Sequence, residues 1–265
     1  MTEHIEFTID GEPVRCERDE MLLDVARRYG FDIPSTCYHE AHTPYGACRL
    51  CVVEVGGDGW SEISPSCTYP IRDQDIEVRT STEEVDRLRR MNMELLLARC
   101  PESEKLKEMA ERLGVDHTRF PADGTDACIS CGLCVNVCRD VVEAGAISFT
   151  GRGTDRHVST PYDEPSEACI GCGACAEVCP TGHIRVEDRE DGTREIVPFE
   201  TVHELVKCPN CGKGYITRKQ LELLEEELAE KRDILRGCPE CREQERGAEL
   251  RKAYCEALTT FIQEE

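Results

Sequence analysis

Several features that would indicate a secreted, membrane or nucleic-acid-binding protein are scarce in this sequence. No apolar run approaches the roughly 18 residues of a membrane span, and the start, MTEHIEFTID, lacks a basic region followed by an apolar stretch. The 32 Lys and Arg residues are outnumbered by 54 Asp and Glu residues, and the net charge of -22 opposes binding to phosphate backbones. We therefore expect a cytoplasmic protein that binds neither nucleic acid nor membrane, with the short basic stretch RLRR (87–90) as a solvated helix face.

Aromatic residues are also few, whereas cysteine is abundant. Aromatics make up 5% of the chain, so a single large aromatic core is not expected, but 19 of the 265 residues are cysteine. Thiols stay reduced in the cytoplasm, which favours metal binding over a disulfide framework. The sequence thus predicts a protein organised by metal centres.

The first 80 residues have the pattern of a small mixed sheet with one helix. Residues 3–17 alternate apolar and polar side chains on both sides of Asp10-Gly11, which is typical of a β-hairpin. An amphipathic helix should follow, with Leu22, Leu23, Val25 and Ala26 on its inner face and its end at Gly30. Further strands are expected at CVVEV (51–55) and DIEVRT (75–80).

Four cysteines in this region have a spacing that suits a 2Fe-2S cluster. Cys37, Cys48, Cys51 and Cys67 are separated by ten, two and fifteen residues. The close CxxC pair can hold one iron, and the two distant cysteines complete the four thiolates that the cluster needs. A zinc site is the alternative, because zinc also accepts four thiolates.

Residues 1–80 resemble the amino-terminal 2Fe-2S domain of a known group of proteins. CYH, GACRLCVVEV and SCTYPIRDQDIEVRT carry the resemblance to the large iron-sulfur subunit of complex I, the diaphorase small subunit of NAD-linked hydrogenases and the iron-only hydrogenases. The resemblance implies a ferredoxin-like β-grasp fold for this domain.

A cysteine motif that occurs twice predicts two 4Fe-4S clusters. CISCGLCVNVC (128–138) and CIGCGACAEVC (169–179) share the spacing C-x2-C-x2-C-x3-C, in which the fourth cysteine ligates the cluster of the other copy. We expect a bacterial-type ferredoxin domain over 125–190. Its two ligand sets would be Cys128, Cys131, Cys134 and Cys179 for the first cluster, and Cys138, Cys169, Cys172 and Cys175 for the second.

The two copies differ after the fourth cysteine. Pro180 follows Cys179, as is common in this motif, but Arg139 follows Cys138. A positive charge beside Cys138 would favour the reduced form of the second cluster and raise its potential. The alternative is that Arg139 points to solvent.

Between these regions, residues 81–124 predict a helical spacer. Ser81 and Glu84 match a capping box at the start of a helix. The group that the amino-terminal domain resembles often has a cluster bound by one His and three Cys at this place. Between residues 81 and 124, Cys100 is the single cysteine and His117 the single histidine. We therefore expect that cluster to be absent.

The last segment, 191–265, predicts a small helical tail with two metal-binding knuckles. Cys208 and Cys211 precede a helix capped by Thr217 and Gln220, and Cys238 and Cys241 follow it. Four thiolates in two CxxC pairs favour structural zinc, with a further iron-sulfur cluster as the alternative. A second helix is expected over 243–265. Outside every cysteine set, Cys16, Cys100 and Cys255 are expected to be apolar packing residues.

The expected fold class is α+β, and the expected function is electron transfer. The segment between the cysteine repeats, especially GRG (151–153), resembles the hydrogenase diaphorase small subunit as well, so the resemblance covers most of residues 1–187. It implies a non-catalytic electron-relay subunit between a flavin partner that binds FMN and NAD(P)H and a hydrogenase or formate dehydrogenase partner, with ferredoxin as a further partner. Anaerobic metabolism and flavin-based bifurcation are compatible with this assignment. A free-standing ferredoxin-like carrier and an iron-sulfur redox sensor are the alternatives.

Overall fold

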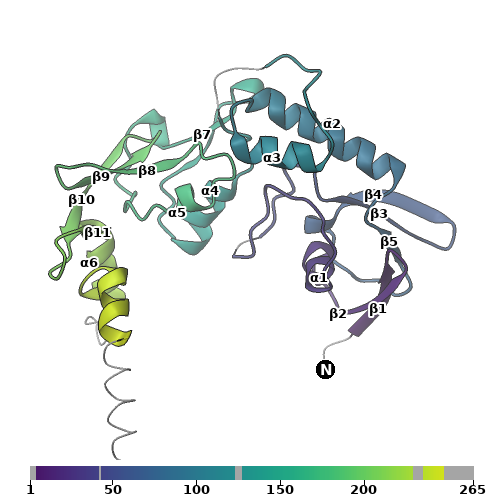
Figure 1. Cartoon of the computed structure of the whole chain (residues 1–265), viewed down its shortest axis with the longest axis horizontal. Coiled ribbons are helices and arrows are strands. Elements are labelled where there is room, and N and C mark those ends of the chain that lie inside the picture. The colour runs from purple at the N-terminus through teal and green to yellow at the C-terminus, as the bar shows by residue number, and fades with distance from the viewer. Residues whose placement is uncertain (1–3, 42, 123–126, 229–234, 248–265) are drawn as a thin grey trace, which may run out of the picture. The chain divides into compact units, whose positions relative to one another are not determined.

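The computed structural model describes residues 4–41, 43–122, 127–228 and 235–247, which form two compact units. Of the described residues, the first unit comprises those up to 163 and 174–185, and the second comprises 164–173 and those from 186 onward. Each unit is an assembly of short helices and strands (Figure 1), which confirms the α+β class. None of the helices in the described ranges is both long and apolar enough to cross a membrane.

The amino-terminal part of the first unit is a five-stranded sheet in the order β2-β1-β5-β3-β4. Neighbouring strands are antiparallel, except that β1 and β5 are parallel. The β1–β2 turn has positive φ at Asp10 and Gly11 (51° and 82°), as a two-residue hairpin turn requires. The strands are β1 (His4–Ile9), β2 (Glu12–Glu17), β3 (Val52–Gly57), β4 (Trp60–Pro65) and β5 (Glu77–Arg79).

Helix α1 (Leu22–Arg28) closes the hydrophobic core of this sheet, and the 3-10 turn Ser66–Thr68 adjoins it. The four residues predicted for its inner face are fully buried. The helix ends at Arg28, Tyr29 is its C-cap, and Gly30 follows with a φ of 89°, close to the end that the sequence predicted. Cys16 is buried in the same core, which confirms that it is a packing residue.

Two helices, α2 (Glu83–Arg99) and α3 (Glu104–Arg112), form the predicted spacer and lie side by side in Figure 1. The capping prediction was wrong by one position: the Thr82 hydroxyl accepts the hydrogen bond from the Val85 amide, while Ser81 bonds to Asp86. Thr82 has the extended backbone of an N-cap residue, so its side chain can turn back onto the first helical turn. Cys100 is buried at the end of α2, and Cys255 lies outside the described residues.

Short elements complete the first unit around the cysteine repeat. The strands β6 and β7 pair as a small antiparallel ribbon, and the two short cysteine-containing helices α4 and α5 contact each other. The elements are α4 (Leu133–Asn136), the π-helical turn Val137–Val141, β6 (Ser148–Thr150), the 3-10 turn Gly153–Asp155, β7 (His157–Ser159), the 3-10 turn Pro161–Asp163 and α5 (Ala174–Glu177).

The second unit contains a four-stranded sheet in the order β11-β10-β9-β8 and a helix after it. Helix α6 contacts β10 and β11, and a further helical segment covers 239–247. Most of the helix predicted at 243–265 lies outside the described residues. The elements are β8 (Arg185–Asp188), β9 (Thr193–Val197), β10 (Thr201–Lys207), β11 (Gly214–Thr217) and α6 (Arg218–Glu227).

Candidate iron-sulfur and metal sites

The four cysteines predicted for the 2Fe-2S cluster are buried together in the first unit. Each is at most 5% exposed. Cys48 donates its amide to the Cys37 sulfur at 3.3 Å, and Cys67 lies in the 3-10 turn that follows β4. Gly46 precedes Cys48 with a φ of 70°, a conformation that lets the loop turn tightly at the edge of the cysteine set.

The thiols of this set contact one another in two pairs. Hydrogen bonding joins Cys37 to Cys48 and Cys51 to Cys67, which lowers the pKa of the Cys48 and Cys51 thiols and raises that of their partners. The close CxxC pair, Cys48 and Cys51, is therefore split between two thiol pairs. A CxxC loop can direct its two sulfurs to different neighbours when the fold brings a distant cysteine to each of them.

The four cysteines predicted for the first 4Fe-4S cluster, or cubane, lie around one pocket in the same unit. We call them the first cubane set, and the four predicted for the other 4Fe-4S cluster the second. Cys128, Cys131, Cys134 and Cys179 line this small pocket together with Ile129, Gly132, Val158, Pro180, Thr181, His183 and Ile184. Burial raises the pKa of the Cys131 thiol to about 12 and that of Cys134 as well, so a bound cation is needed to hold both as thiolates. The mostly apolar lining and four sulfurs fit a cluster.

Helix α2 supports the loop of this first cubane set. Arg99, its last residue, donates from Nε to the Cys128 carbonyl at 2.8 Å and from Nη2 to the Ser130 hydroxyl at 3.2 Å. Gly132 has a φ of 80° and begins α4, which carries Cys134. The sequence reasoning assigned no role to Arg99, because its partners lie about thirty residues further along the chain.

The ligands predicted for the second cubane belong to both units. In the first unit, the Cys138 sulfur accepts a hydrogen bond from the Ala146 amide at 3.3 Å. In the second unit, the Thr201 hydroxyl donates to the Cys169 sulfur at 3.5 Å. Cys175 belongs to the first unit and Cys172 to the second. Their assignment as one ligand set stays a prediction.

The side chain of Arg139 points to solvent, which was the alternative considered for this residue. Its guanidinium forms a two-point ion pair with Asp140, with Nε–Oδ1 and Nη2–Oδ2 distances of 2.6 and 2.8 Å, and its side chain is 61% exposed. The neighbouring carboxylate offsets the charge, and water screens what remains. We therefore expect little influence of Arg139 on a cluster at Cys138.

The 2Fe-2S and first cubane sets share one hydrophobic cluster of the first unit. Cys37 and Cys48 of the one set and Cys131 of the other are buried in it, and Cys48 is among the charges that raise the pKa of Cys131. Met93, Leu97 and Cys100 belong to the same cluster, so α2 packs against both sets. Cys100 thus serves as apolar packing, as predicted.

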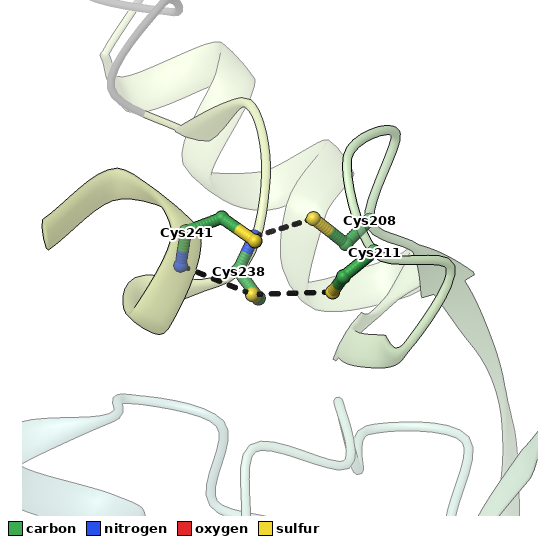
Figure 2. Close-up of side chains that lie close together, drawn as sticks. All are labelled: Cys208, Cys211, Cys238 and Cys241. Atoms are coloured by element: carbon green, nitrogen blue, oxygen red, sulfur yellow. Dashed lines mark hydrogen bonds between the residues drawn. The ribbon is translucent and has the colours of Figure 1, made fainter. Parts of the chain in front are cut away.

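The four tail cysteines form a compact site in the second unit. Figure 2 shows their side chains gathered together, Cys208 and Cys211 from the loop between β10 and β11, Cys238 from just before the 239–247 segment and Cys241 from its first turn. All four sulfurs lie within 4.8 Å of one another, and those of Cys211 and Cys238 are 3.7 Å apart. Elsewhere in the described ranges, no set of three or more potential ligands is gathered this closely.

Backbone amides polarise this tail site for metal binding. The Cys238 amide donates to the Cys208 sulfur at 3.2 Å, and the Cys241 amide donates to the Cys238 sulfur at 3.5 Å. Hydrogen bonds from the Cys238 and Cys211 backbones lower the pKa of the Cys208 thiol to about 6. The arrangement therefore favours a thiolate in the absence of any ion, as a metal site requires.

Two models of known protein families match parts of the chain. A 2Fe-2S iron-sulfur cluster binding domain matches residues 2–83, and a 4Fe-4S dicluster domain matches 127–183 and again 168–214. These matches confirm the two predicted kinds of iron-sulfur domain. The second dicluster match extends to Cys208 and Cys211 but ends before Cys238.

Among curated proteins, the chain is similar to components of NAD- and NADP-linked complexes. It is 29% identical to a subunit of an NADH-quinone oxidoreductase of Rhizobium meliloti (strain 1021) over 79% of this chain and 27% of that protein. It is 30% identical to the HndD subunit of the NADP-reducing hydrogenase of Solidesulfovibrio fructosivorans over 56% of this chain and 30% of that protein. The chain thus spans less than a third of the length of either relative.

A solved structure is similar as well. The crystal structure of an NAD+-reducing [NiFe]-hydrogenase in the H2-reduced state contains a chain that is 29% identical, with a TM-score of 0.50. The likeness covers 59% of this chain and 74% of that one. The resemblance to iron-sulfur subunits of NAD(P)-linked enzymes, predicted from the motifs, is therefore confirmed.

Proposed function

We propose that the chain is an electron-relay subunit that uses one 2Fe-2S and two 4Fe-4S clusters. The relay would connect a flavin-containing, NAD(P)H-oxidising partner with a hydrogenase or formate dehydrogenase partner. The observation that carries the proposal is the hydrophobic cluster that buries Cys37 and Cys48 together with Cys131. Electron transfer requires neighbouring centres, because tunnelling weakens steeply with distance, and this shared core keeps two cysteine sets close together within one unit.

The cysteines predicted for the second cubane extend this series of centres beyond the first cubane. Cys175, assigned to the second cubane, is among the charges that raise the pKa of Cys134, assigned to the first. Both residues belong to the first unit, on the contacting helices α5 and α4. The proposed order of electron carriers is therefore the 2Fe-2S cluster, the first cubane and the second cubane.

The ligand assignment that we propose for the 2Fe-2S cluster gives each iron one thiol pair. Cys37 and Cys48 would hold one iron, and Cys51 and Cys67 the other, in agreement with the thiol contacts. The cluster supplies reversible one-electron storage when bound. The residues of the chain exclude water from it, because all four cysteines are buried.

For the tail we propose a structural zinc ion. A tetrahedral ion with Zn–S bonds of about 2.3 Å places its ligands about 3.8 Å apart. The 3.7 Å between the Cys211 and Cys238 sulfurs agrees with that value. A cubane would spread its four thiolates over four different iron atoms, which calls for a wider site than this one.

Substrate chemistry would then occur on partner subunits that bind FMN and NAD(P), with ferredoxin as a further electron donor or acceptor. The sequence has no G-x-G-x-x-G dinucleotide motif. The names of the relatives, an NADH-quinone oxidoreductase and two nicotinamide-linked hydrogenases, support such partners.

Anaerobic affinity purification with metal analysis of the same sample tests this proposal. We expect about ten irons and one zinc per chain, and copurification of a flavoprotein together with a hydrogenase-like or formate dehydrogenase-like subunit. About fourteen irons without zinc would reassign the tail to a third cubane. Isolation of a monomer that a separate reductase reduces with NADH would overturn the subunit function in favour of a free carrier.

A further inference from the structure

One arginine of the basic stretch at 87–90 is not solvated. Arg89 is 5% exposed, whereas the side chain of Arg87, two positions earlier on α2, is 70% exposed. The prediction of a solvated face was therefore wrong for Arg89. A buried guanidinium is rare unless a specific set of acceptors holds it, so its surroundings call for a function.

The acceptors of Arg89 are two carbonyl groups on either side of a proposed cluster ligand. Nε donates to the Leu50 carbonyl at 3.1 Å, and Nη2 donates to the Val52 carbonyl at 2.7 Å. Leu50 and Val52 are the chain neighbours of Cys51. The Arg89 side chain, on α2, therefore holds the backbone on both sides of Cys51 by hydrogen bonds, at the point where β3 begins.

One carboxylate lies within ion-pair distance of Arg89 in the described ranges. It is that of Asp86, at 3.9 Å, and it is 38% exposed. Burial lowers the pKa of Arg89, whereas the charges of Asp86, Cys51, Asp32 and Asp10, in decreasing order, oppose that shift. An arginine starts from so high a pKa that it remains a cation in the folded protein.

We propose that Arg89 sets the reduction potential of the 2Fe-2S cluster by holding a fixed positive charge beside the Cys51 ligand. The inference deepens the proposed function and rests on the 2Fe-2S assignment within it. One-electron reduction adds a single negative charge to the cluster and its thiolates, and no proton is needed for the balance. A nearby cation stabilises that more negative state, so Arg89 raises the potential.

Burial decides the strength of this effect. Water and salt screen charges at exposed positions, but they screen a buried charge much less. Arg87 carries the same charge on the same helix, pairs with Glu84 at 3.5 Å and is mostly exposed. The two arginines therefore form a matched pair in which the distance from solvent is the main difference.

The test is an EPR-monitored redox titration of the full chain, purified anaerobically, with dithionite as reductant and chemical mediators. In Arg89→Gln we expect the one-electron equilibrium of the 2Fe-2S cluster to shift about tenfold toward the oxidised form, a lowering of about 59 mV. In Arg87→Gln we expect less than a twofold shift. Asp86→Asn should shift the equilibrium in the opposite direction, because it removes the carboxylate that pairs with Arg89.

The variant Arg89→Lys separates the effect of the positive charge from the effect of the hydrogen bonds to the Leu50 and Val52 carbonyls. Lysine keeps the positive charge but loses the planar fork that reaches both carbonyls, so its potential should stay within about twofold of the unmodified chain. If Arg89→Gln does not retain the cluster, Arg89→Lys decides alone: a tenfold shift in that variant overturns the proposal. Equal potentials in Arg89→Gln and the unmodified chain overturn it as well.

This titration does not depend on partner subunits. Failure to isolate a flavoprotein partner would contradict the relay function and leave the Arg89 result intact. Conversely, an unchanged potential in Arg89→Gln would reject the role of Arg89 and leave the relay function standing. Iron and sulfide content, measured on each variant, verifies that the potentials refer to the same cluster.

Discussion

The cysteines of the 2Fe-2S region and those of the tail are held in different surroundings. Around Cys37, Cys48, Cys51 and Cys67, a five-stranded sheet and α1 bury an extensive hydrophobic core, and each cysteine is at most 5% exposed. In the tail, Cys208 and Cys238 are buried, but Cys211 is exposed, Cys241 is half-buried, and α6 has no buried residue. The first region has a large core of its own, whereas α6 and the 239–247 segment place no buried side chain beside the four sulfurs of the tail.

This contrast predicts which region needs its metal to fold. A small unit with a thin core depends on ion binding for its folding free energy, about 10 kcal/mol or more for structural zinc in peptides. A sheet with a complete apolar core has its own source of stability. The following predictions test that difference, from the largest expected effect to the smallest.

The largest effect is expected from removing one ligand in each region. Cys238→Ser should abolish zinc binding and remove hydrogen-exchange protection from the segment around 208–241, while the iron content stays at about ten. The matched variant, Cys51→Ser, should lose the 2Fe-2S signal but keep protection in β1, β2 and α1. Loss of protection in those elements of Cys51→Ser would contradict the comparison.

The next largest effect concerns the apolar side chains that cover the two regions. Leu23 is fully buried in the core of the sheet, whereas Leu224, on α6, is half-buried. Leu23→Ala should lower the free energy of unfolding of its region by about 2–5 kcal/mol, because it leaves a cavity. Leu224→Ala should cost about 1 kcal/mol or less. Segment-resolved hydrogen exchange in denaturant measures both, and equal costs would refute the contrast.

A smaller difference is expected between the two helix caps. Thr82 accepts a hydrogen bond from the Val85 amide, and Thr82→Ala should cost about 1 kcal/mol. Thr217 accepts from the Gln220 amide, is fully buried, and also bonds the Ile170 carbonyl. Thr217→Ala should therefore cost about 2 kcal/mol, since it leaves that carbonyl unpaired as well. A smaller cost for Thr217→Ala than for Thr82→Ala would show that the second bond contributes nothing.

The smallest effect is expected at Arg139. Because Asp140 offsets its charge, replacing Arg139 should change the cluster potentials by less than a twofold shift of the one-electron equilibrium. Arg139→Gln avoids the backbone change that proline would bring, and an EPR-monitored titration gives the measurement. A tenfold shift, about 59 mV, would restore the electrical role first considered for this residue.

The sequence alone was enough to predict a 2Fe-2S domain and a 4Fe-4S dicluster domain. Spacings such as C-x2-C-x2-C-x3-C are local, so the chain geometry that wraps a loop around a cubane is already present in a dozen residues. The Asp10-Gly11 hairpin and the inner face of α1 were predictable for the same reason, because a turn and a helix depend on near neighbours.

Tertiary structure decided everything that depends on distant partners. The pairing of Cys37 with Cys48 and of Cys51 with Cys67 follows from how the loop folds over the sheet, and no spacing rule distinguishes it from the CxxC pairing. Arg87 and Arg89 look alike in a basic stretch, yet it is Arg89 that reaches the carbonyls beside Cys51, nearly forty positions earlier. A charge becomes a candidate for setting a cluster potential only when the fold removes it from water and places it beside a ligand, and those conditions arise from long-range packing.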